Sequence, residues 1–257
     1  MNRQAQAAMM FLVGAALLHA GATDLYLRYV KAGLRPLLLA AGVVLIVSAL
    51  ATAWYEWRRS RRRTASTATS TATSAATSAA TSTATDHSHP EPRISWLLVL
   101  PLLALILIAP PALGSYSALR AGTALQQPYG YTKLPTGDPI PLALVDYAGR
   151  AVYDHGRSLD GHRVRISGFV AVDSAGTPYL VRMALNCCAA DAQPVKVALT
   201  GKIPPVLQPD AWLQVTGTYT ARRTHDPVNG GPIPFLQVTE AKPIPTPADP
   251  YDETWNN

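Results

Sequence analysis

Three apolar stretches of membrane-spanning length constrain the fold of this chain more than any other feature of its sequence. They lie at residues 7–27, 34–57 and 94–113. Each is close to the ~20 residues that a helix needs to cross a hydrocarbon layer of about 30 Å. Charged residues make up only 15% of the chain, well below the roughly 25% of an ordinary soluble domain. The sequence therefore predicts three transmembrane helices.

The first apolar stretch also has to be compared with a secretory signal, which likewise begins with an apolar run. Its basic n-region is a single arginine, Arg3, and polar residues interrupt the region where cleavage would occur. We therefore predict a retained helix. His19 and Asp24 fall in or near this span, and ionisable groups at membrane depth are candidates for function. His19 lies deeper and is the better candidate for an interhelical or proton-relay role.

The orientation of the helices follows from the lysines and arginines near their ends, because the richer side is cytoplasmic. One side holds Arg3, Arg58, Arg59, Arg61, Arg62, Arg63 and Arg93. The other side holds Arg28, Lys31, Arg35 and Arg120. This distribution predicts a cytoplasmic N-terminus and, after three crossings, an extracytoplasmic C-terminal domain in a multi-pass protein of the cell membrane.

A Thr/Ser/Ala tract at residues 64–92 separates the second and third spans. It has almost no large apolar side chains, so it cannot offset the entropy lost on ordering. We predict a basic flank and disordered linker at residues 58–93. His87 and His89 lie in this tract, and we interpret them as carrying no site.

The C-terminal part, residues 115–257, has the pattern of a small β domain. Short alternating apolar runs are separated by Gly, Pro and Asn, as in small barrels and sandwiches. The predicted strands are residues 163–172, 177–185, 194–201, 211–220 and 233–244.

Two of these strands share a glycine within an apolar alternation, VRISGFV and LQVTGTY. A glycine inside a strand often marks a bulge or a tight bend at a barrel corner. We therefore predict an antiparallel barrel that resembles the OB-fold, and an α+β membrane protein as a whole.

Nucleic-acid binding is not expected, although the formal net charge is +6. Much of that charge lies at residues 58–63, beside a membrane span, where the positive-inside rule places it. A single-strand-binding barrel also needs exposed aromatic rings. The tail has few aromatics, and we expect these to lie in the core or at the barrel ends: Tyr179, Trp212, Tyr219 and Phe235.

The two cysteines of the chain are neighbours, Cys187 and Cys188, in the stretch MALNCCAADAQPV. A disulfide needs Cα atoms about 4.4–6.8 Å apart, whereas Cα atoms across a trans peptide lie about 3.8 Å apart. A bond between them would therefore be strained and labile. Four interpretations stay open: a divalent metal site such as zinc, with Asp191 or with His155 or His162; a redox-labile disulfide; a cross-link to a partner; or simple packing, with strand alternation placing the side chains on opposite faces.

Several stretches together resemble the YcgQ-like family of bacterial membrane proteins, described as the small subunit of a two-component permease complex. They are HAGATDLYLRYVKAGLRPLL, GHRVRISGFV, RMALNCCAADAQPV, AWLQVTGTY and PADPYDETW. The resemblance covers most of the chain apart from the linker, and CCAADA followed by QPV is its most specific part. The third span and the long linker depart from the family pattern and leave the topology open.

The resemblance implies a non-enzymatic accessory subunit with an extracytoplasmic OB-like domain and a larger multi-span permease as partner, in contact with membrane lipid. It directs attention to Arg182, Cys187, Cys188, Asp191 and Ala192 without giving them roles. The sequence shows no catalytic triad spacing, phosphate loop or metalloprotease motif. The alternative is a self-standing, membrane-anchored metal- or redox-sensing protein. A thiol oxidoreductase would need thiols of depressed pKa, and no helix start or basic cluster adjoins the pair.

Overall fold

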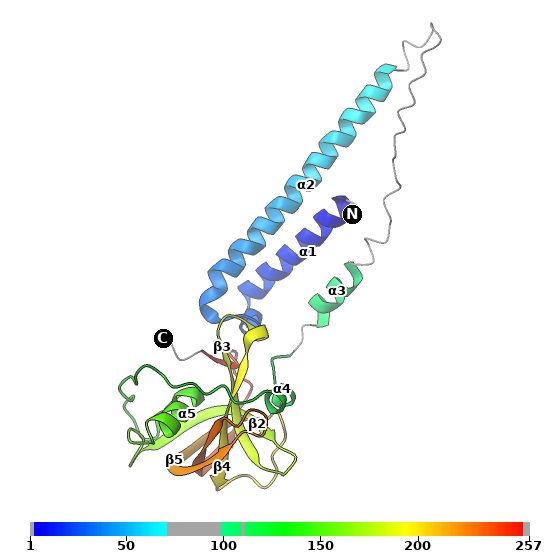
Figure 1. Ribbon diagram of the computed structural model, residues 1–257. Helices are drawn as coiled ribbons and strands as arrows, with labels where there is room; N and C mark the ends of the chain where they lie inside the picture. Colours follow the sequence, from blue (N-terminus) through cyan, green and yellow to red (C-terminus); the bar gives the residue numbers. More distant parts are fainter. Residues whose placement is uncertain (1–2, 71–98, 109–110, 254–257) are drawn as a thin grey trace. The chain divides into compact units, whose positions relative to one another are not determined.

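The computed structural model describes residues 3–70, 99–108 and 111–253 and divides the chain into two compact units (Figure 1). A helical unit comprises Met1–Thr23 and Pro36–Pro110. A β unit comprises Pro111–Asn257 together with Asp24–Arg35, the segment that joins the first two helices. We call residues 24–35 the helix-connecting loop.

The helical unit contains two helices long and apolar enough to cross a membrane, α1 (Arg3–Ala22) and α2 (Arg35–Ser70). The outer surface of α2 is apolar: its residues Leu37, Val44 and Val47 are 67%, 63% and 59% exposed. An apolar surface of this kind is expected to contact lipid or another protein rather than water. The first two predicted spans are therefore present as helices.

Small residues allow α1 and α2 to pack closely. A Cβ atom added to Gly14 of α1 would lie 2.8 Å from Ile46 Cγ1 and 2.9 Å from the carbonyl oxygen of Gly42, both in α2. Ala5 and Ala49, one from each helix, are also buried. Helix pairs in membranes commonly associate through such small residues, because they let the two backbones approach.

The third predicted span is described only in part. Helix α3 (Val99–Ile108) covers ten residues of it, and ten residues extend only about 15 Å. The flanking residues 94–98 and 109–110 lie outside the described part of the chain, as do residues 71–93 with His87 and His89. The third crossing therefore remains a prediction.

The basic flank and the start of the predicted linker are helical, which corrects the expected end of the second helix at Trp57. Helix α2 continues to Ser70. The guanidinium of Arg58 stacks on Trp54 at 3.9 Å, and that of Arg61 stacks on Trp57 at 3.8 Å. Pairs four residues apart stabilise a helix, and Arg and Ala have high helix propensity. The helix therefore extends beyond the apolar residues.

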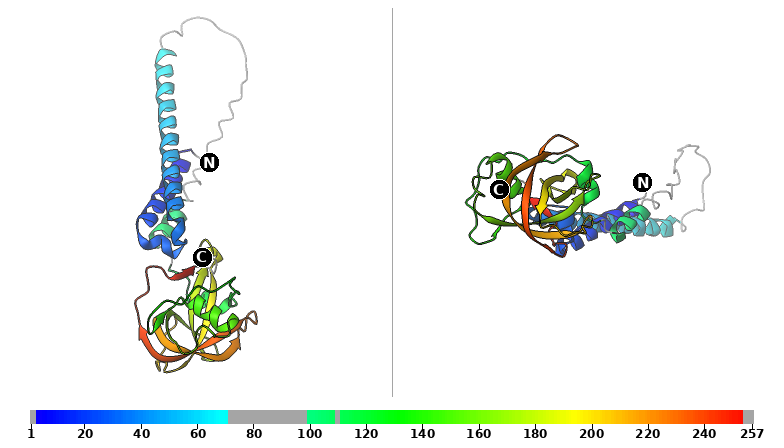
Figure 2. Two further views of the ribbon diagram at one scale, coloured as in Figure 1. Left: turned by 90° about the vertical axis from the view of Figure 1, so that its left-hand side faces the viewer. Right: turned by 90° about the horizontal axis from the view of Figure 1, so that it is seen from below.

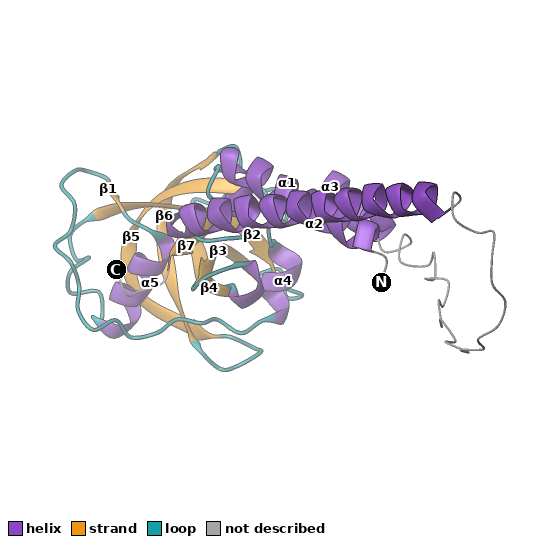
Figure 3. Ribbon diagram, turned by 90° about the horizontal axis from the view of Figure 1, so that it is seen from above, coloured by secondary structure: helices purple, strands orange, loops and turns teal. Residues whose placement is uncertain are grey.

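The β unit is built around a closed five-stranded barrel (Figures 2 and 3). Its strands are β2 (Arg163–Val172), β3 (Pro178–Leu185), β4 (Gln193–Gly201), β5 (Trp212–His225) and β6 (Pro232–Pro243). Around the barrel they follow the order β2-β5-β6-β4-β3, and β3 pairs with β2 to close it. All five predicted strands are confirmed, within one residue except at the end of β5.

The predicted barrel was antiparallel, and this is wrong for one of the five barrel pairings. Strands β4 and β6 run parallel, while the other four pairings are antiparallel. The cause is that β5 pairs with β2 and leaves the edge of β4 free for β6. Strand β6 runs antiparallel to β5, and β5 runs opposite to β4, so β6 and β4 point the same way. Two short strands, β1 (Ile140–Pro141) and β7 (Tyr251–Glu253), add parallel pairings to β2 and β3.

Of the two strand glycines, Gly217 lies at an irregularity of the barrel, as predicted, and Gly168 lies at a close approach of two strands. A Cβ atom on Gly217 would lie 2.4 Å from the carbonyl oxygen of Gln237, and the β5–β6 register shifts at this point. A Cβ atom on Gly168 would lie 2.6 Å from the carbonyl oxygen of Val181. The next residue, Phe169, pairs with both β3 and β5. Glycine thus permits the close approach that closes the barrel.

Helix α5 (Leu144–Tyr153) was not predicted and contacts all five barrel strands. It buries Leu144, Tyr147, Ala148 and Ala151, which lie on one helix face. The hydroxyl of Tyr147 donates to the carbonyl oxygen of Phe235 at 2.7 Å. The short helix α4 (Ser115–Arg120) packs against β2 and β3. The expected core aromatics are confirmed: Tyr179, Trp212 and Phe235 are buried, and Tyr219 is partly buried against the core.

Candidate functional site: a cysteine turn that binds the helix-connecting loop

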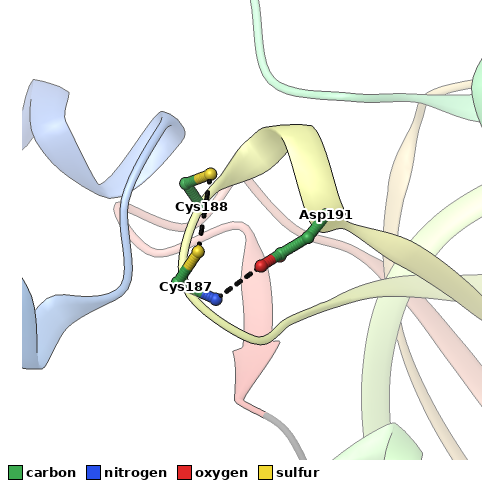
Figure 4. A group of neighbouring side chains, drawn as sticks. All are labelled: Cys187, Cys188 and Asp191. Atoms are coloured by element: carbon green, nitrogen blue, oxygen red, sulfur yellow. Dashed lines mark hydrogen bonds between the residues drawn. The ribbon is translucent and has the colours of Figure 1, made fainter.

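Both cysteines lie in a tight turn between β3 and β4, residues 186–192, which we call the cysteine turn. It includes the 3-10 helix η4 (Ala189–Asp191). Cys187 is exposed and Cys188 is half-buried, and both are free thiols. Their Sγ atoms lie 3.7 Å apart (Figure 4). The interpretation that strand alternation separates them is wrong, because β3 ends at Leu185 and the pair lies beyond it.

Asp191 organises the backbone of this turn. Its carboxylate oxygens accept the N–H groups of Asn186 at 3.1 Å and Cys187 at 2.8 Å. Its own N–H donates to the carbonyl oxygen of Cys188 at 3.0 Å. The two sulfurs and one carboxylate oxygen lie within 4.8 Å of one another. Within the described part of the chain, these three residues form the one such group of potential metal ligands.

The electrostatics of the turn favour a protonated Cys187 thiol when no ion is bound. A hydrogen bond to Asp191, with a second contribution from Cys188, raises the pKa of the Cys187 thiol to about 12. Burial by itself would raise the pKa of Asp191, but hydrogen bonds from Cys187 and Asn186 outweigh it and lower that pKa. A thiol held in its neutral form is a poor nucleophile. The geometry therefore disfavours a thiol oxidoreductase.

The helix-connecting loop pairs with the cysteine turn through its backbone. Val30 and Cys188 form an isolated antiparallel bridge. The N–H of Lys31 donates to the carbonyl oxygen of Cys187 at 3.1 Å, and the N–H of Ala189 donates to that of Tyr29 at 2.7 Å. The sequence analysis did not find this contact, because no local pattern indicates a bridge between segments so far apart in the chain. Any change in the backbone of the turn therefore acts directly on this loop.

Arg182 and the end of the chain support the turn from β3. The Nε of Arg182 donates to Asp252 Oδ1 at 2.8 Å, and its Nη2 donates to the carbonyl oxygen of Tyr251 at 3.1 Å. The guanidinium also lies 5.1 Å from the ring centre of Trp212. Ala192 ends the turn and packs against the core. Both motif residues thus have structural roles next to the cysteines.

Tyr251 joins two parts of the chain that lead to helices. Its hydroxyl donates to the carbonyl oxygen of Arg28 at 3.0 Å, in the helix-connecting loop. The same oxygen accepts the N–H of Leu113 at 3.2 Å, in the segment after the third apolar stretch. We call that segment, residues 111–125, the connector. The DPY sequence therefore supplies one hydroxyl that contacts both segments.

A buried ion pair attaches the connector to the barrel. Lys196 Nζ lies 2.7 Å from Asp226 Oδ2, and the two side chains are 3% and 0% exposed. The ammonium also donates to the carbonyl oxygen of Ala121 at 2.9 Å. Asp226 accepts the N–H of Thr123 at 2.9 Å. Sequence analysis did not identify this pair, because neither residue lies in a recognisable motif.

The other predicted site residues do not join the cysteines. His155 lies after α5, with its Nδ1 3.2 Å from an Arg223 nitrogen. His162 lines a separate hollow of about 720 Å³ together with Arg150. Of the three predicted partners of Cys187 and Cys188, the described part of the chain groups Asp191 with them and neither histidine.

The two polar residues near the first span differ in position. His19 lies in the last turn of α1 and is exposed. Helix α1 ends at Ala22, and Asp24 begins the 3-10 helix η1 (Asp24–Arg28), where it is exposed. Asp24 therefore lies just beyond α1, and its predicted place at the outer end of the first span stays a prediction.

Comparison with known proteins recognises the barrel. No curated protein and no solved structure matches the chain. A family model does match one segment of the chain, which begins in α5 and ends in β7. This segment contains the whole barrel and the cysteine turn. Residues 145–252 match the DUF1980 C-terminal domain, which is consistent with a member of the YcgQ-like family.

Proposed function

We propose that the protein is a non-enzymatic, membrane-anchored accessory subunit of a permease complex, with its barrel on the extracytoplasmic face. The observation that carries this proposal is the pairing of the helix-connecting loop with the cysteine turn. It holds the loop between the two apolar helices to the barrel through backbone hydrogen bonds. A barrel attached in this way is suited to sense or cover the outer mouth of a membrane partner.

The same pairing supports a third membrane crossing. If α1 and α2 both cross the bilayer, the loop between them lies at one face, and the barrel that binds it lies at that face too. Helix α2 carries the chain to the opposite face. The chain must therefore cross once more before the connector, and residues 94–114 are the apolar segment that can do so.

Sidedness follows from the arginines at the far end of α2. The run from Arg58 to Arg63 lies within α2, just beyond its apolar part and on the side away from the loop, and the positive-inside rule assigns such a run to the cytoplasm. The barrel then lies outside. Its strand order, with five strands closed by the β2–β3 pairing and one parallel pairing between β4 and β6, supports assignment to the OB-type Greek-key barrels.

Thiol labelling in intact cells tests the topology, because the chain has two cysteines and both lie in the turn. We expect a membrane-impermeant maleimide to label the wild-type protein before lysis. In a background with Cys187→Ser and Cys188→Ser, a Ser60→Cys variant should react only after permeabilisation. Labelling of both positions from the same side would exclude a third crossing between them.

Association with a permease is tested by co-expression with a multi-span permease. The family resemblance leads us to expect that this permease is encoded next to the protein. We expect the two chains to co-purify in mild detergent at a fixed ratio. The matched control is the same permease with an unrelated three-helix membrane protein carrying the same tag. A wild-type chain that purifies alone as a monodisperse monomer, with the permease left behind, contradicts the accessory role.

A second candidate function rests on the grouped side chains of Cys187, Cys188 and Asp191. In this alternative the protein stands alone and senses a metal ion or the redox state through the turn. The helices then serve as an anchor. It is favoured if the purified chain binds a ligand at the turn without any partner.

A further inference from the structure

The spacing of the two sulfurs distinguishes between kinds of metal ion. Two thiolates bound to a tetrahedral ion at the Zn–S distance of about 2.3 Å lie about 3.8 Å apart. A linear, two-coordinate ion with bonds of the same length would hold them about 4.6 Å apart. The Sγ atoms of Cys187 and Cys188 lie 3.7 Å apart. The turn therefore holds its sulfurs at the tetrahedral spacing.

Asp191 offers a third, pre-oriented ligand. Two backbone N–H groups, from Asn186 and Cys187, fix its carboxylate beside the sulfurs. Each carboxylate oxygen has more than one acceptor site, so an oxygen that accepts an N–H can still bind a cation. Hydrogen bonds of this kind orient metal ligands and tune their affinity. Figure 4 shows the carboxylate and both sulfurs gathered at the same turn.

We propose that Cys187, Cys188 and Asp191 bind one divalent, thiophilic cation of the zinc class in tetrahedral geometry, with the fourth position open to an exchangeable ligand. Three protein ligands and an open position distinguish reactive or exchanging zinc sites from closed structural ones. Cys187 is exposed, so an ion can enter and leave. Binding displaces the two thiol protons into solvent. This inference deepens the sensing alternative at the same turn and does not depend on a permease partner.

The bound ion would also change the helix-connecting loop. The carbonyl of Cys187 and the N–H of Ala189 belong to the turn, and both hydrogen-bond to this loop. An ion that fixes the turn slows the openings that break these bonds. We therefore expect hydrogen exchange at the amides of Lys31 and Ala189 to slow when the ion binds. The amide of Ala124 in the connector, which donates to the carbonyl oxygen of Pro194 in β4, is the internal control and should not change.

The test uses the full-length, reduced chain in detergent with Co²⁺, a spectroscopic substitute for Zn²⁺. We expect one Co²⁺ per chain, with thiolate-to-cobalt charge-transfer absorption and the visible bands of a tetrahedral site. Cys187→Ser should lower the charge-transfer absorption by about half, since one of two thiolates is lost, and Cys187→Ser with Cys188→Ser should abolish it. Asp191→Asn should weaken binding by about 10-fold or more. Zn²⁺ should displace the Co²⁺.

The matched controls are His155→Ala and His162→Ala, which lie outside the turn and should leave the spectrum unchanged. Hydrogen exchange of the barrel amides without metal shows that each variant is folded. Absence of the charge-transfer absorption in the folded wild-type chain overturns the proposal. So does binding that survives the double serine substitution, or six-coordinate Co²⁺ spectra. None of these results bears on co-purification with a permease, so the two proposals fail separately.

Discussion

The barrel holds two segments that lead to apolar helices, and it holds them by different means. The helix-connecting loop is attached at an exposed turn by backbone hydrogen bonds from Lys31 and Ala189. The connector is attached by Lys196 and Asp226, an ion pair that is almost completely buried. The first attachment can open without exposing any charge to the protein interior. The second cannot, so the connector is a fixed part of the barrel and the loop is the adjustable one.

The largest expected effect comes from breaking the fixed attachment. Asp226→Ala leaves the Lys196 ammonium buried without its carboxylate and removes the acceptor for Thr123. Breaking a buried ion pair by removing one partner costs about 3–5 kcal/mol. We expect the free energy of opening of the β4 amides, measured by hydrogen exchange in the full chain, to fall by about that amount.

The matched control for this variant is Glu240→Ala, which removes the acid of an exposed pair with Lys242. An exposed pair contributes little to stability because solvent screens it, so β4 should exchange almost as in the wild type. If Asp226→Ala costs no more than Glu240→Ala, the connector is not held by the buried pair and the contrast between the two attachments disappears.

The second-largest effect is expected from Arg182, which holds β7, the strand that contacts both the helix-connecting loop and the connector. Arg182→Ala removes the partner of Asp252 and a donor to the carbonyl of Tyr251. Hydrogen bonds to charged groups contribute about 1.5–3 kcal/mol, and both side chains of the pair are mostly buried. We expect β7 to detach and the amides of Lys31 and Leu113 both to exchange faster. Arg163→Ala, at the exposed pair with Asp138, is the control. Unchanged exchange at both amides would show that β7 holds neither segment.

Much of the barrel could be predicted from the sequence, because strand alternation is a local pattern. The pairing of β4 with β6 could not be predicted, because it depends on the long-range pairing of β5 with β2 and β6. Helix α5 was missed although its buried residues follow a clear helical period. The cysteines were recognised as a candidate site. Their side chains lie close together because they belong to a turn after the end of β3 and not to the strand itself. The role of Val30 depends on a single long-range bridge.

A smaller effect is expected from removing one atom, the Tyr251 hydroxyl oxygen, which contacts both the helix-connecting loop and the connector. Tyr251→Phe removes the hydroxyl that contacts Arg28 and Leu113 while keeping the ring in the core. A net hydrogen bond contributes about 0.5–1.5 kcal/mol, so barrel stability should fall by about that amount. The amide of Leu113 loses its acceptor and should exchange faster. The amide of Thr123 keeps Asp226 as its acceptor and should not change. Faster exchange at Thr123 would mean that the connector opens as one piece.

The smallest effect is expected at the cysteines themselves. In metal-free protein, Cys187→Ser with Cys188→Ser should leave barrel stability almost unchanged, because Cys187 is exposed and Cys188 is only half-buried, in a turn outside the barrel strands. The loop is bound to this turn through backbone atoms, and serine keeps the backbone and nearly the same side-chain size. Exchange at Lys31 should therefore match the wild type without metal and differ only when Zn²⁺ is present. A loop that is already released in the metal-free double variant would show that the thiols hold it by packing, and that its attachment is not adjusted by an ion.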